Sequence, residues 1–420
     1  MKRLLFSSLF VLTLVQTVSA VDTLAKDDLL RTALRDNPQV KAACARWKAA
    51  KQRIPQARAW EDLMVGVDAV WMGPLRLNKV DDAEFMVSQA IPISGKNLSR
   101  ARASLAEALA AFQEYRRTQL DVLTRAQSAY YRLSGAYGQL EINQRNQELL
   151  KQFAEISRRK YEVGTATQSD VLLAETELAR LSETKAVIER EISDQQSQIN
   201  ILINCPATKP VPKPGPLTFQ TSSLQSQKVE TLAARCRPEV LMAWRKIEAE
   251  RARLQLAHRQ WIPDPTFKVT TRPFNSDQDF REVTAGISFN VPWINAKKYS
   301  AGVAEAEDNL ANAKHEYETS QVAATALVRD QLKKIETFAT NYRLFHDQIA
   351  PTAKMTVEST RAGYETDKSG FLDLLTARRT LQDIESSGLT QLIEHEVAVA
   401  ELEATVGVSP YLCEPKDASK

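Results

Sequence analysis

The chain has 420 residues, with 55 basic and 52 acidic side chains and a formal net charge of +3. A charge so close to neutral does not indicate a nucleic-acid partner or an acidic ligand. Only 7% of the residues are aromatic, while Ala, Leu, Glu, Gln, Arg and Lys are abundant, a composition that favours long helices in a coiled-coil-like assembly over a compact enzyme.

Residues 1–20 have the pattern of a secretory signal peptide. Lys2 and Arg3 form a charged start, Leu4 to Val15 is apolar, and Val18-Ser19-Ala20 offers a small-residue cleavage site. The apolar run is too short to cross about 30 Å of hydrocarbon as a helix. No cysteine follows the cleavage site, so a lipoprotein anchor is not indicated. We therefore expect the mature chain to leave the cytoplasm.

The remainder of the sequence repeats itself at an offset of about 200 residues. The corresponding segments are Asn37-Pro38-Gln39-Val40 with Arg237-Pro238-Glu239-Val240, Ile91-Pro92 with Val291-Pro292, and Tyr161 to Asp170 with Tyr364 to Asp373. Each half is predicted to contain a helix, a short β-hairpin, a very long helix, a turn and a helix. The repeats are expected at 21–205 and 233–408, joined by a linker at 206–232 and followed by a tail at 409–420.

Two very long helices are predicted, one in each half. Proline is absent from Asn97 to about Tyr161, and apolar residues recur there at spacings of three and four. The second long helix runs from about Ala301 to Gly363, with one interruption at Pro351. Each would be about 95 Å long. The shorter helices, about 26–58 and 168–203 in the first half, have nearly the same summed length. We expect them to be stacked end to end beside the long one.

Four strands are predicted, at about 62–72, 83–92, 266–273 and 282–291. Apolar and polar residues alternate along them over roughly 10 residues, the length of a transmembrane β-strand. The polar face expected to line water comprises Lys268, Thr270, Arg272, Thr284, Ser288 and Asn290. Four strands leave open edges, which lipid does not tolerate. Two copies would give eight strands and a filled interior, whereas three would give twelve strands and a channel, so we expect a trimer.

Four cysteines enter an oxidising compartment, where one or two disulfides are possible. Cys205 and Cys236 flank the segment between the halves and are the pair we expect, although Cys44 and Cys413 leave other pairings open.

Sites for catalysis, cofactors or metal ions are not predicted. Ser94-Gly95-Lys96 lacks the upstream glycine and the context of a P-loop. The four histidines are His258, His315, His346 and His395, and none has a histidine partner at helical spacing. The sequence therefore predicts a protein that is not an enzyme, and any energy for transport must come from a partner.

The sequence resembles the outer-membrane efflux (TolC-like) family over nearly the whole mature chain. The resemblance rests on the duplicated layout, the two helical turns, and the runs Gln89-Ala90-Ile91-Pro92-Ile93-Ser94-Gly95-Lys96 and Val291-Pro292-Trp293-Ile294-Asn295. It implies a homotrimer whose 12-stranded β-barrel contacts outer-membrane lipid and caps an α-helical tunnel in the periplasm. A belt is expected from the linker, which begins with the proline-rich run 206–216, and from the tail.

The same resemblance implies a passive exit duct of a tripartite efflux system. Its partners would be a periplasmic adaptor (membrane fusion) protein and an inner-membrane pump, with a pump of the RND type expected first. The alternatives are a type I protein-secretion duct and a periplasmic coiled-coil scaffold without a pore. The run from Pro292 to Ser300 also resembles the heavy-metal-efflux branch, but the substrate stays open.

By the same resemblance, the two helical turns would close the tunnel and receive the adaptor. The gate positions are Ser169, Asp170, Tyr364, Ser369 and Asp373, and the docking positions are Val163, Gly164, Thr165, Thr366, Asp367 and Lys368. Thr165 departs from the family pattern at the tip that would receive the adaptor. Ser369 and Thr376 depart from it at gate positions, which suggests a weaker or differently gated constriction.

The expected latch is a hydrogen bond from the Tyr364 hydroxyl to Asp170 on the neighbouring hairpin. An alternative role for Asp170 is to cap the returning helix. Three copies of Asp373 would form a cation-favouring acidic ring. Because Asp367 stands where glycine is usual, Gly370 is expected to supply the second turn.

Overall fold

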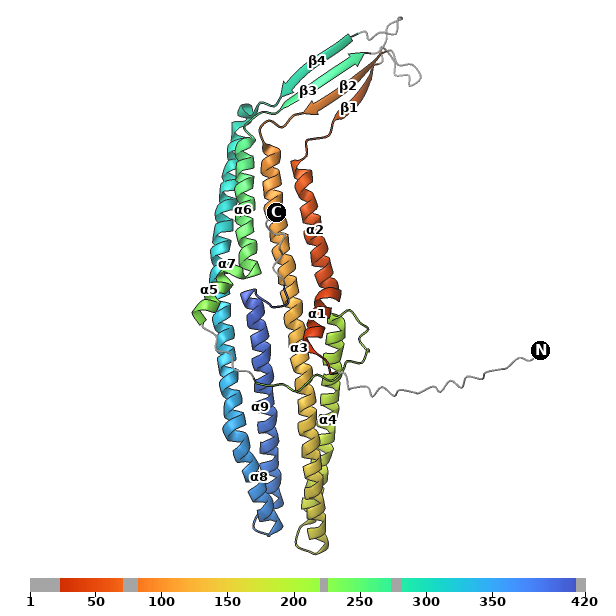
Figure 1. The fold of residues 1–420 in the computed structure, drawn as a ribbon, viewed down its shortest axis with the longest axis vertical. Helices are drawn as coiled ribbons and strands as arrows, with labels where there is room; N and C mark the ends of the chain where they lie inside the picture. Colours follow the sequence, from red (N-terminus) through yellow and green to blue (C-terminus); the bar gives the residue numbers. More distant parts are fainter. Residues whose placement is uncertain (1–22, 71–81, 220–225, 273–281, 413–420) are drawn as a thin grey trace, which may run out of the picture.

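The computed structural model describes residues 23–70, 82–219, 226–272 and 282–412, so the expected signal peptide and Cys413 lie outside the described residues. A long helical bundle carries a small β-sheet at one end, and two helical turns form the other end (Figure 1). This mainly helical architecture with a small four-stranded sheet confirms the predicted fold class. None of the helices in the described ranges is long and apolar enough to cross a membrane.

The elements follow the duplicated order that the sequence predicts. The first half contains α1 (Lys26–Asp36), α2 (Pro38–Arg58), β1 (Met64–Val70), β2 (Asp82–Ala90), α3 (Lys96–Glu162) and α4 (Gln168–Leu202). The second half contains α5 (Ser226–Cys236), α6 (Pro238–Arg259), β3 (Pro265–Arg272), β4 (Glu282–Phe289), η1 (Pro292–Asn295), α7 (Ala296–Leu344), the π-helix η2 (Phe345–Ile349), α8 (Ala350–Glu365) and α9 (Phe371–Val406). With 67 residues, α3 is about 100 Å long.

The short helices are stacked end to end beside the long one, as expected from their lengths. In the first half, the Asn37 side chain accepts hydrogen bonds from the amides of Gln39 (2.8 Å) and Val40 (3.3 Å), which caps α2. Its amide also donates to the carbonyl of Leu202 (3.0 Å) at the end of α4. One side chain therefore fixes the start of one helix against the end of the other.

The second half makes the same junction by close packing. Gly407 ends α9 with φ of 81°, and a Cβ added there would lie 2.7 Å from the carbonyl oxygen of Cys236. Helix α9 therefore ends directly against the start of α6, and glycine is required there by both conformation and space.

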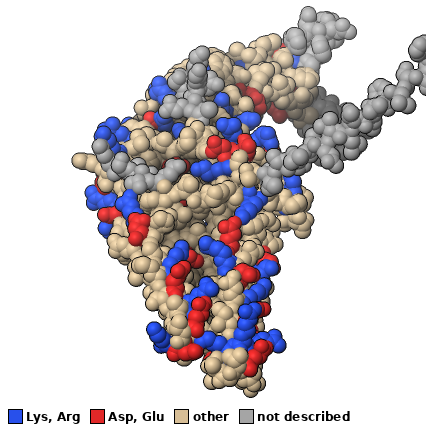
Figure 2. Space-filling model, turned by 60° about the horizontal axis from the view of Figure 1, so that its bottom comes forward, with Lys and Arg blue, Asp and Glu red and all other residues tan. Residues whose placement is uncertain are grey.

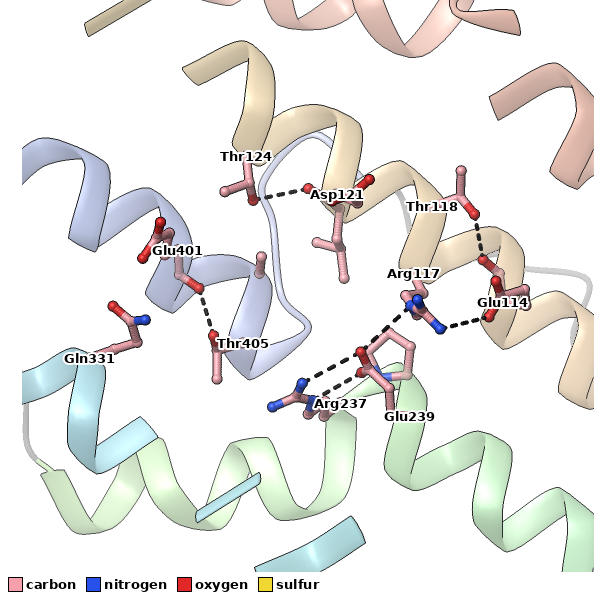
Figure 3. Close-up of a pocket in the computed structure, with 13 residues that line it drawn as sticks. Glu114, Arg117, Thr118, Asp121, Thr124, Arg237, Glu239, Gln331, Glu401 and Thr405 are labelled. Carbon is pink, nitrogen blue, oxygen red and sulfur yellow. Dashed lines mark hydrogen bonds and ion pairs between the residues drawn. The ribbon is translucent and has the colours of Figure 1, made fainter. Parts of the chain in front are cut away.

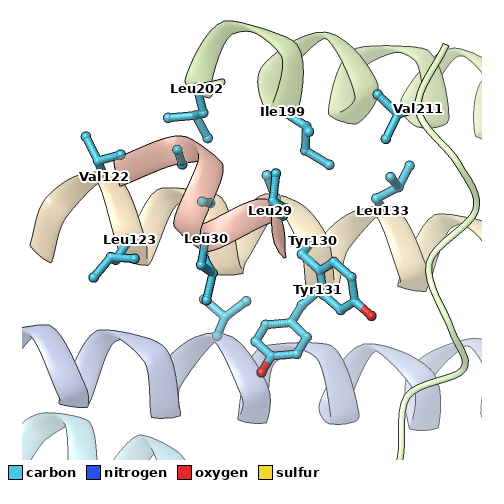
Figure 4. Packing of buried hydrophobic residues seen from close by; sticks show 14 of the residues in the cluster. Leu29, Leu30, Val122, Leu123, Tyr130, Tyr131, Leu133, Ile199, Leu202 and Val211 are labelled. Atoms are coloured by element: carbon cyan, nitrogen blue, oxygen red, sulfur yellow. The ribbon is translucent and has the colours of Figure 1, made fainter. Parts of the chain in front are cut away.

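A hydrophobic cluster holds α1, α3, α4 and the linker together midway along the bundle (Figure 4). Its members include Leu29, Leu30, Val122, Leu123, Leu133, Ile199, Leu202 and Val211. The linker crosses the bundle there, since the Leu24 amide donates to Lys213 O (3.1 Å) and the Ser134 hydroxyl donates to Gly215 O (3.0 Å). These contacts fasten this part of the linker to the segment before α1 and to α3.

The disulfide expected between Cys205 and Cys236 is wrong. Both cysteines are free, as is Cys44. Cys205 follows α4, which packs against α3, whereas Cys236 ends α5, which packs on α7 and α9. The two residues are near in the linker's sequence, but the helices that carry them lie on different parts of the bundle (Figure 1).

The four strands form one antiparallel sheet in the order β1-β2-β3-β4. Val269 pairs with Val87 on one side and Ala285 on the other, and directly opposed residues share a face of the sheet. The register places a row of exposed apolar side chains on one face: Val65, Val67, Phe85, Val87, Phe267, Val269, Val283, Ile287 and Phe289.

The opposite face carries the polar residues predicted to line water, with Lys268, Thr270, Arg272, Thr284 and Ser288 in register. Ser88 and Thr270 on this face are buried, and Arg272 lies 3.9 Å from Glu84 and 3.8 Å from Glu282. Asn290 lies just beyond the end of β4.

The run Ser94-Gly95-Lys96 fastens the sheet to the bundle. The Asp264 carboxylate accepts hydrogen bonds from the Ser94 amide and hydroxyl, both at 2.9 Å, and from Lys96 Nζ at 2.8 Å. Gly95 has φ of 71°, and its carbonyl accepts from Arg259 (2.7 Å). These residues hold the strand-to-helix crossings of the two repeats together.

Candidate gate at the helical tips

Each hairpin turn depends on one residue in the left-handed conformation. Gly164 has φ of 78° in the first turn and Asp367 has φ of 60° in the second. The expectation that Gly370 would supply the second turn is wrong, because Gly370 has φ of −76° and is the N-cap of α9. Aspartate tolerates the left-handed region better than most residues, so Asp367 replaces the usual glycine directly.

The first turn gives a direct test of this backbone requirement. Gly164→Ala is expected to destabilise the turn by about 1–2 kcal/mol, the usual cost of the left-handed conformation. A Cβ at Gly164 would meet nothing within 4 Å, so the loss would come from the backbone alone. Gly215→Ala is the matched control, since its added Cβ is also free and its φ is not positive. Thermal unfolding of both variants would check this, and an equal loss in both would contradict it.

The two acidic gate candidates have the same local role. Asp170 accepts a hydrogen bond from the Thr167 amide (3.3 Å), and Asp373 accepts one from the Gly370 amide (3.2 Å). Thr167, not Asp170, is the N-cap of α4, and Asp170 completes its capping box. Asp373 is exposed and Asp170 half-buried.

Within the chain, the Tyr364 hydroxyl bonds with Ser157 rather than with Asp170. The two oxygens lie 2.9 Å apart, and Tyr364 is only 5% exposed with its ring 5.5 Å from Phe371. Burial raises the pKa of Tyr364, the hydrogen bond to Ser157 opposes this, and the charge of Asp170 adds to the rise. Asp170 is therefore near the tyrosine, but Ser157 on α3 is its partner in this chain.

Lys160, which the sequence analysis missed, joins the two hairpins. Its Nζ lies 2.5 Å from the Asp367 carboxylate and donates to the Tyr364 carbonyl at 2.5 Å. The same atom lies 4.8 Å from the centre of the Tyr364 ring, and the side chain is only 13% exposed. A lysine amid surface charges gives no periodic signal, so only the tertiary structure identifies it.

A second tie between the hairpins lies further along the bundle. Arg379 on α9 donates through Nε to Glu177 on α4 at 3.1 Å, and its Nη2 contacts the other carboxylate oxygen. Arg180 lies 3.3 Å from the same carboxylate. Burial would raise the pKa of Glu177, but the bonds from Arg379 and the nearby arginine charges hold it below its ordinary value. The ion pair therefore persists at neutral and mildly acidic pH.

A cluster of buried side chains also joins the two hairpins near these two ties. Its members are Leu150, Phe153, Ala174, Leu181, Tyr364, Phe371, Leu374 and Leu375. The residues of the turns themselves are mostly exposed, including Val163, Gly164, Thr165, Thr366, Asp367, Lys368 and Ser169. Ser369 is half-buried, and its hydroxyl donates to the Thr360 carbonyl (3.0 Å). Figure 2 shows the end of the bundle as largely uncharged, with basic and acidic side chains side by side on its flanks.

A cavity of about 380 Å³ lies midway along the bundle, between α3, α6, α7 and α9 (Figure 3). Four of the charged side chains that line it pair with one another. Arg237 bonds to Glu239 at 2.9 Å, and Arg117 lies 3.8 Å from Glu239 and 3.3 Å from Glu114. Among the described residues, no cluster of His, Cys, Asp and Glu could hold a metal ion.

The comparisons with known proteins agree with this geometry. The chain is 23% identical to the outer membrane protein TolC of Vibrio cholerae serotype O1 over 97% of this chain and 96% of that protein. Its fold matches the outer-membrane channel OprN with a TM-score of 0.81 and 17% identity, over 91% and 90% of the two chains. It matches CusC with a TM-score of 0.79 and 18% identity, over 91% and 92%.

The TM-scores for OprN and CusC are nearly equal. Similarity of fold therefore does not assign the chain to the CusC-like, heavy-metal-efflux branch. The family model of the outer membrane efflux proteins matches residues 29–203 and 231–408, which contain the four strands and nearly all of the helical residues. The chain therefore belongs to the outer membrane efflux protein family, whose members are channels of the outer membrane rather than enzymes.

Proposed function

We propose that three copies of this chain form a passive exit duct, with a 12-stranded barrel in the outer membrane and a helical tunnel in the periplasm. The observation that carries the proposal is the row of nine exposed apolar side chains on one face of a four-stranded sheet. Such a face suits lipid, but β1 and β4 leave open edges that lipid does not tolerate. Three copies would pair these edges and enclose a water-filled lumen.

In this duct, Lys268, Thr270, Arg272, Thr284, Ser288 and Asn290 would face the lumen. The helical tips would form the periplasmic constriction, with Asp170 and Asp373 near its axis and Lys160 holding the two hairpins of each chain together. The exposed turn residues Val163, Gly164, Thr165, Thr366, Asp367 and Lys368 would receive the periplasmic adaptor, and Ser169, Tyr364 and Ser369 would belong to the gate.

Substrate would arrive from an inner-membrane pump of the RND type through that adaptor, and the duct would conduct it outward without consuming energy. The second candidate, a type I protein-secretion duct, would use the same pore with a different pump. Co-purification of the cross-linked complex with its pump would separate these two roles.

The proposal is tested by oligomeric state and conductance. The full chain, expressed with its own leader, is expected to fractionate with the outer membrane and to purify in detergent as a trimer. It should give single-channel steps in planar bilayers. A monodisperse monomer in the periplasmic fraction, or a trimer that gives no steps even with the hairpin ties removed, would contradict the proposal.

A further inference from the structure

The two repeats correspond residue by residue in the part of the bundle next to the sheet. Helices α2 and α6 begin at Pro38 and Pro238. Helices α3 and α7 begin at Lys96 and Ala296. The residues before α2 and α6 also share their backbone angles, with φ of −60° and −61° and ψ of 126° and 128°. Each residue of α2 or of the first part of α3 therefore has its equivalent 200 positions later, in α6 or α7.

One helix contact of this region joins the two repeats, and its counterpart is missing from a single chain. Within each repeat, α2 packs on α3 and α6 packs on α7, while the contact between α3 and α6 joins the first repeat to the second. The equivalent contact from the second repeat onward would join α7 to an α2. In Figure 1, α2 and α7 lie at opposite edges of the bundle, with α3 and α6 between them. Only another copy of the chain can therefore supply that α2.

The burial of equivalent alanines identifies the flanks that this missing contact leaves open. Ala249 on α6 is 3% exposed, whereas its equivalent Ala49 on α2 belongs to the exposed class. Ala101 on α3 is 7% exposed, whereas its equivalent Ala301 on α7 is again exposed. Because the side chains within each pair are the same, the difference comes from the neighbouring helix. Alanine on both open flanks permits two helices to pack closely, since the distance between helix axes depends on the side chains at the contact.

The charges of the two open flanks are complementary. Helix α2 contains six basic residues and no acidic one, and in the described ranges only Lys41 of these six makes an ion pair. Residues 301–318 of α7 contain five acidic residues, one lysine and no arginine. Three of the acids, Glu305, Glu307 and Asp308, are exposed and have no ion pair within the described part of the chain. Opposite charges on two surfaces steer their approach and fix their register.

An ion pair in the contact between α3 and α6 has both of its equivalents on the open flanks. Arg253 of α6 pairs with Glu107 of α3. Their equivalents are Arg53 on α2 and Glu307 on α7, with the same residue types at both positions. Both side chains are exposed, and neither has an ion pair with any residue that the structure describes. The chain thus carries the two halves of a second ion pair, which a single copy cannot form.

We propose that Arg53 of one copy pairs with Glu307 of the next, across a seam in which α2 packs on α7 as α6 packs on α3. This inference rests on the proposed trimer and specifies which helices meet between its copies and in which register. An exposed ion pair contributes little to stability, so the pair fixes the register while the alanine-bearing flanks supply most of the contact. Three such head-to-tail seams close a ring and leave no flank open.

Cross-linking of the full-length protein in its membranes tests the seam. The four native cysteines are replaced by serine, and Arg53→Cys is combined with Glu307→Cys in one chain. A short bismaleimide is expected to link each copy to the next, which gives covalent dimers and trimers on a denaturing gel. Glu107→Cys with Arg253→Cys is the matched control, because this pair lies within one chain and should give internally linked monomers only.

Two further combinations test the register and the direction of the seam. Arg53→Cys with Glu318→Cys moves one site by about 16 Å along α7 and is expected to lower the yield of linked trimer at least fivefold. Co-expression of Arg53→Cys chains with Glu307→Cys chains should give linked dimers that contain one chain of each kind. Linked trimers should be absent from this mixture, because each chain then carries only one reactive site.

Charge reversal tests the ion pair itself. Arg53→Glu places an acid opposite Glu307, and Glu307→Arg places a base opposite Arg53. Each change is expected to lower the temperature at which the detergent-solubilised trimer dissociates. The two changes together restore opposite charges and should recover more than half of the loss. Additive losses in the combined variant would overturn the pair.

The outcomes separate the seam from the proposed duct. A trimer with single-channel steps, but without links between positions 53 and 307, would overturn the seam only. Equal yields of linked trimer for positions 307 and 318 would overturn the proposed register. A monomer that gives neither links nor conductance steps would overturn the proposed duct, and the seam with it.

Discussion

Val269→Arg is expected to abolish accumulation of the trimer in the outer membrane. Val269 lies near the middle of β3, is 47% exposed and pairs with Val87 and Ala285 on the apolar face. An arginine directed into lipid near the bilayer midplane costs about 2–4 kcal/mol. Three copies would therefore lose about 6–12 kcal/mol, which is comparable with the whole stability of an ordinary domain.

Thr284→Arg is the matched control for this change. Thr284 pairs with Thr270 on the polar face, where Lys268 and Arg272 already place cations. An arginine there would face water in the proposed lumen and should leave the yield of trimer in membranes nearly unchanged. Equal losses of trimer for Val269→Arg and Thr284→Arg would show that the apolar face does not meet lipid.

Lys160→Ala is expected to raise the open probability of the isolated trimer strongly without loss of assembly. Lys160 donates to the Tyr364 carbonyl and pairs with Asp367. A hydrogen bond from a charged group contributes about 1.5–3 kcal/mol, and Asp367 adds little because exposed ion pairs are weak. Three copies together supply about 4.5–9 kcal/mol, whereas about 5.5 kcal/mol moves a two-state equilibrium from 1:99 to 99:1.

Lys368→Ala controls for the removal of a positive charge from the same tip, since Lys368 is exposed in the second turn. Tyr364→Phe should have a smaller effect than Lys160→Ala, because it removes only the hydroxyl contact with Ser157, worth about 0.5–1.5 kcal/mol. Single-channel recording in planar bilayers would measure all three variants. If Lys160→Ala conducts like the unmodified protein, closure depends on contacts between protomers.

Local patterns in the sequence were sufficient to predict the secondary structure and its order along one chain. Helix length follows from uninterrupted spacing of apolar residues, and the face of each strand follows from simple alternation, because side chains point to opposite sides with a period of two. The pairing of Val269 with Ala285 confirms that alternation. The helix predicted at about 26–58 is divided at Asn37 into α1 and α2, although an N-cap followed by proline is a local signal for the start of a helix.

The contacts of the candidate gate could not be predicted from local sequence patterns, because they join residues about 200 positions apart. Lys160 resembles any other surface lysine in the sequence, and its role appears only when α8 brings the Tyr364 carbonyl and Asp367 beside it. Tyr364 was predicted as a gate residue, but its partner within the chain, Ser157, depends on how two helices pack. The separation of Cys205 from Cys236 likewise follows from the helices on which α4 and α5 pack.

The sequence by itself therefore determined the duplicated helix-and-hairpin plan and the two faces of the sheet, because both arise from periodicities within one element. Tertiary structure alone decided which polar groups tie the hairpins together. Hydrogen bonds and ion pairs act over about 3 Å, so their partners are fixed only after long helices have been brought into register by their packing.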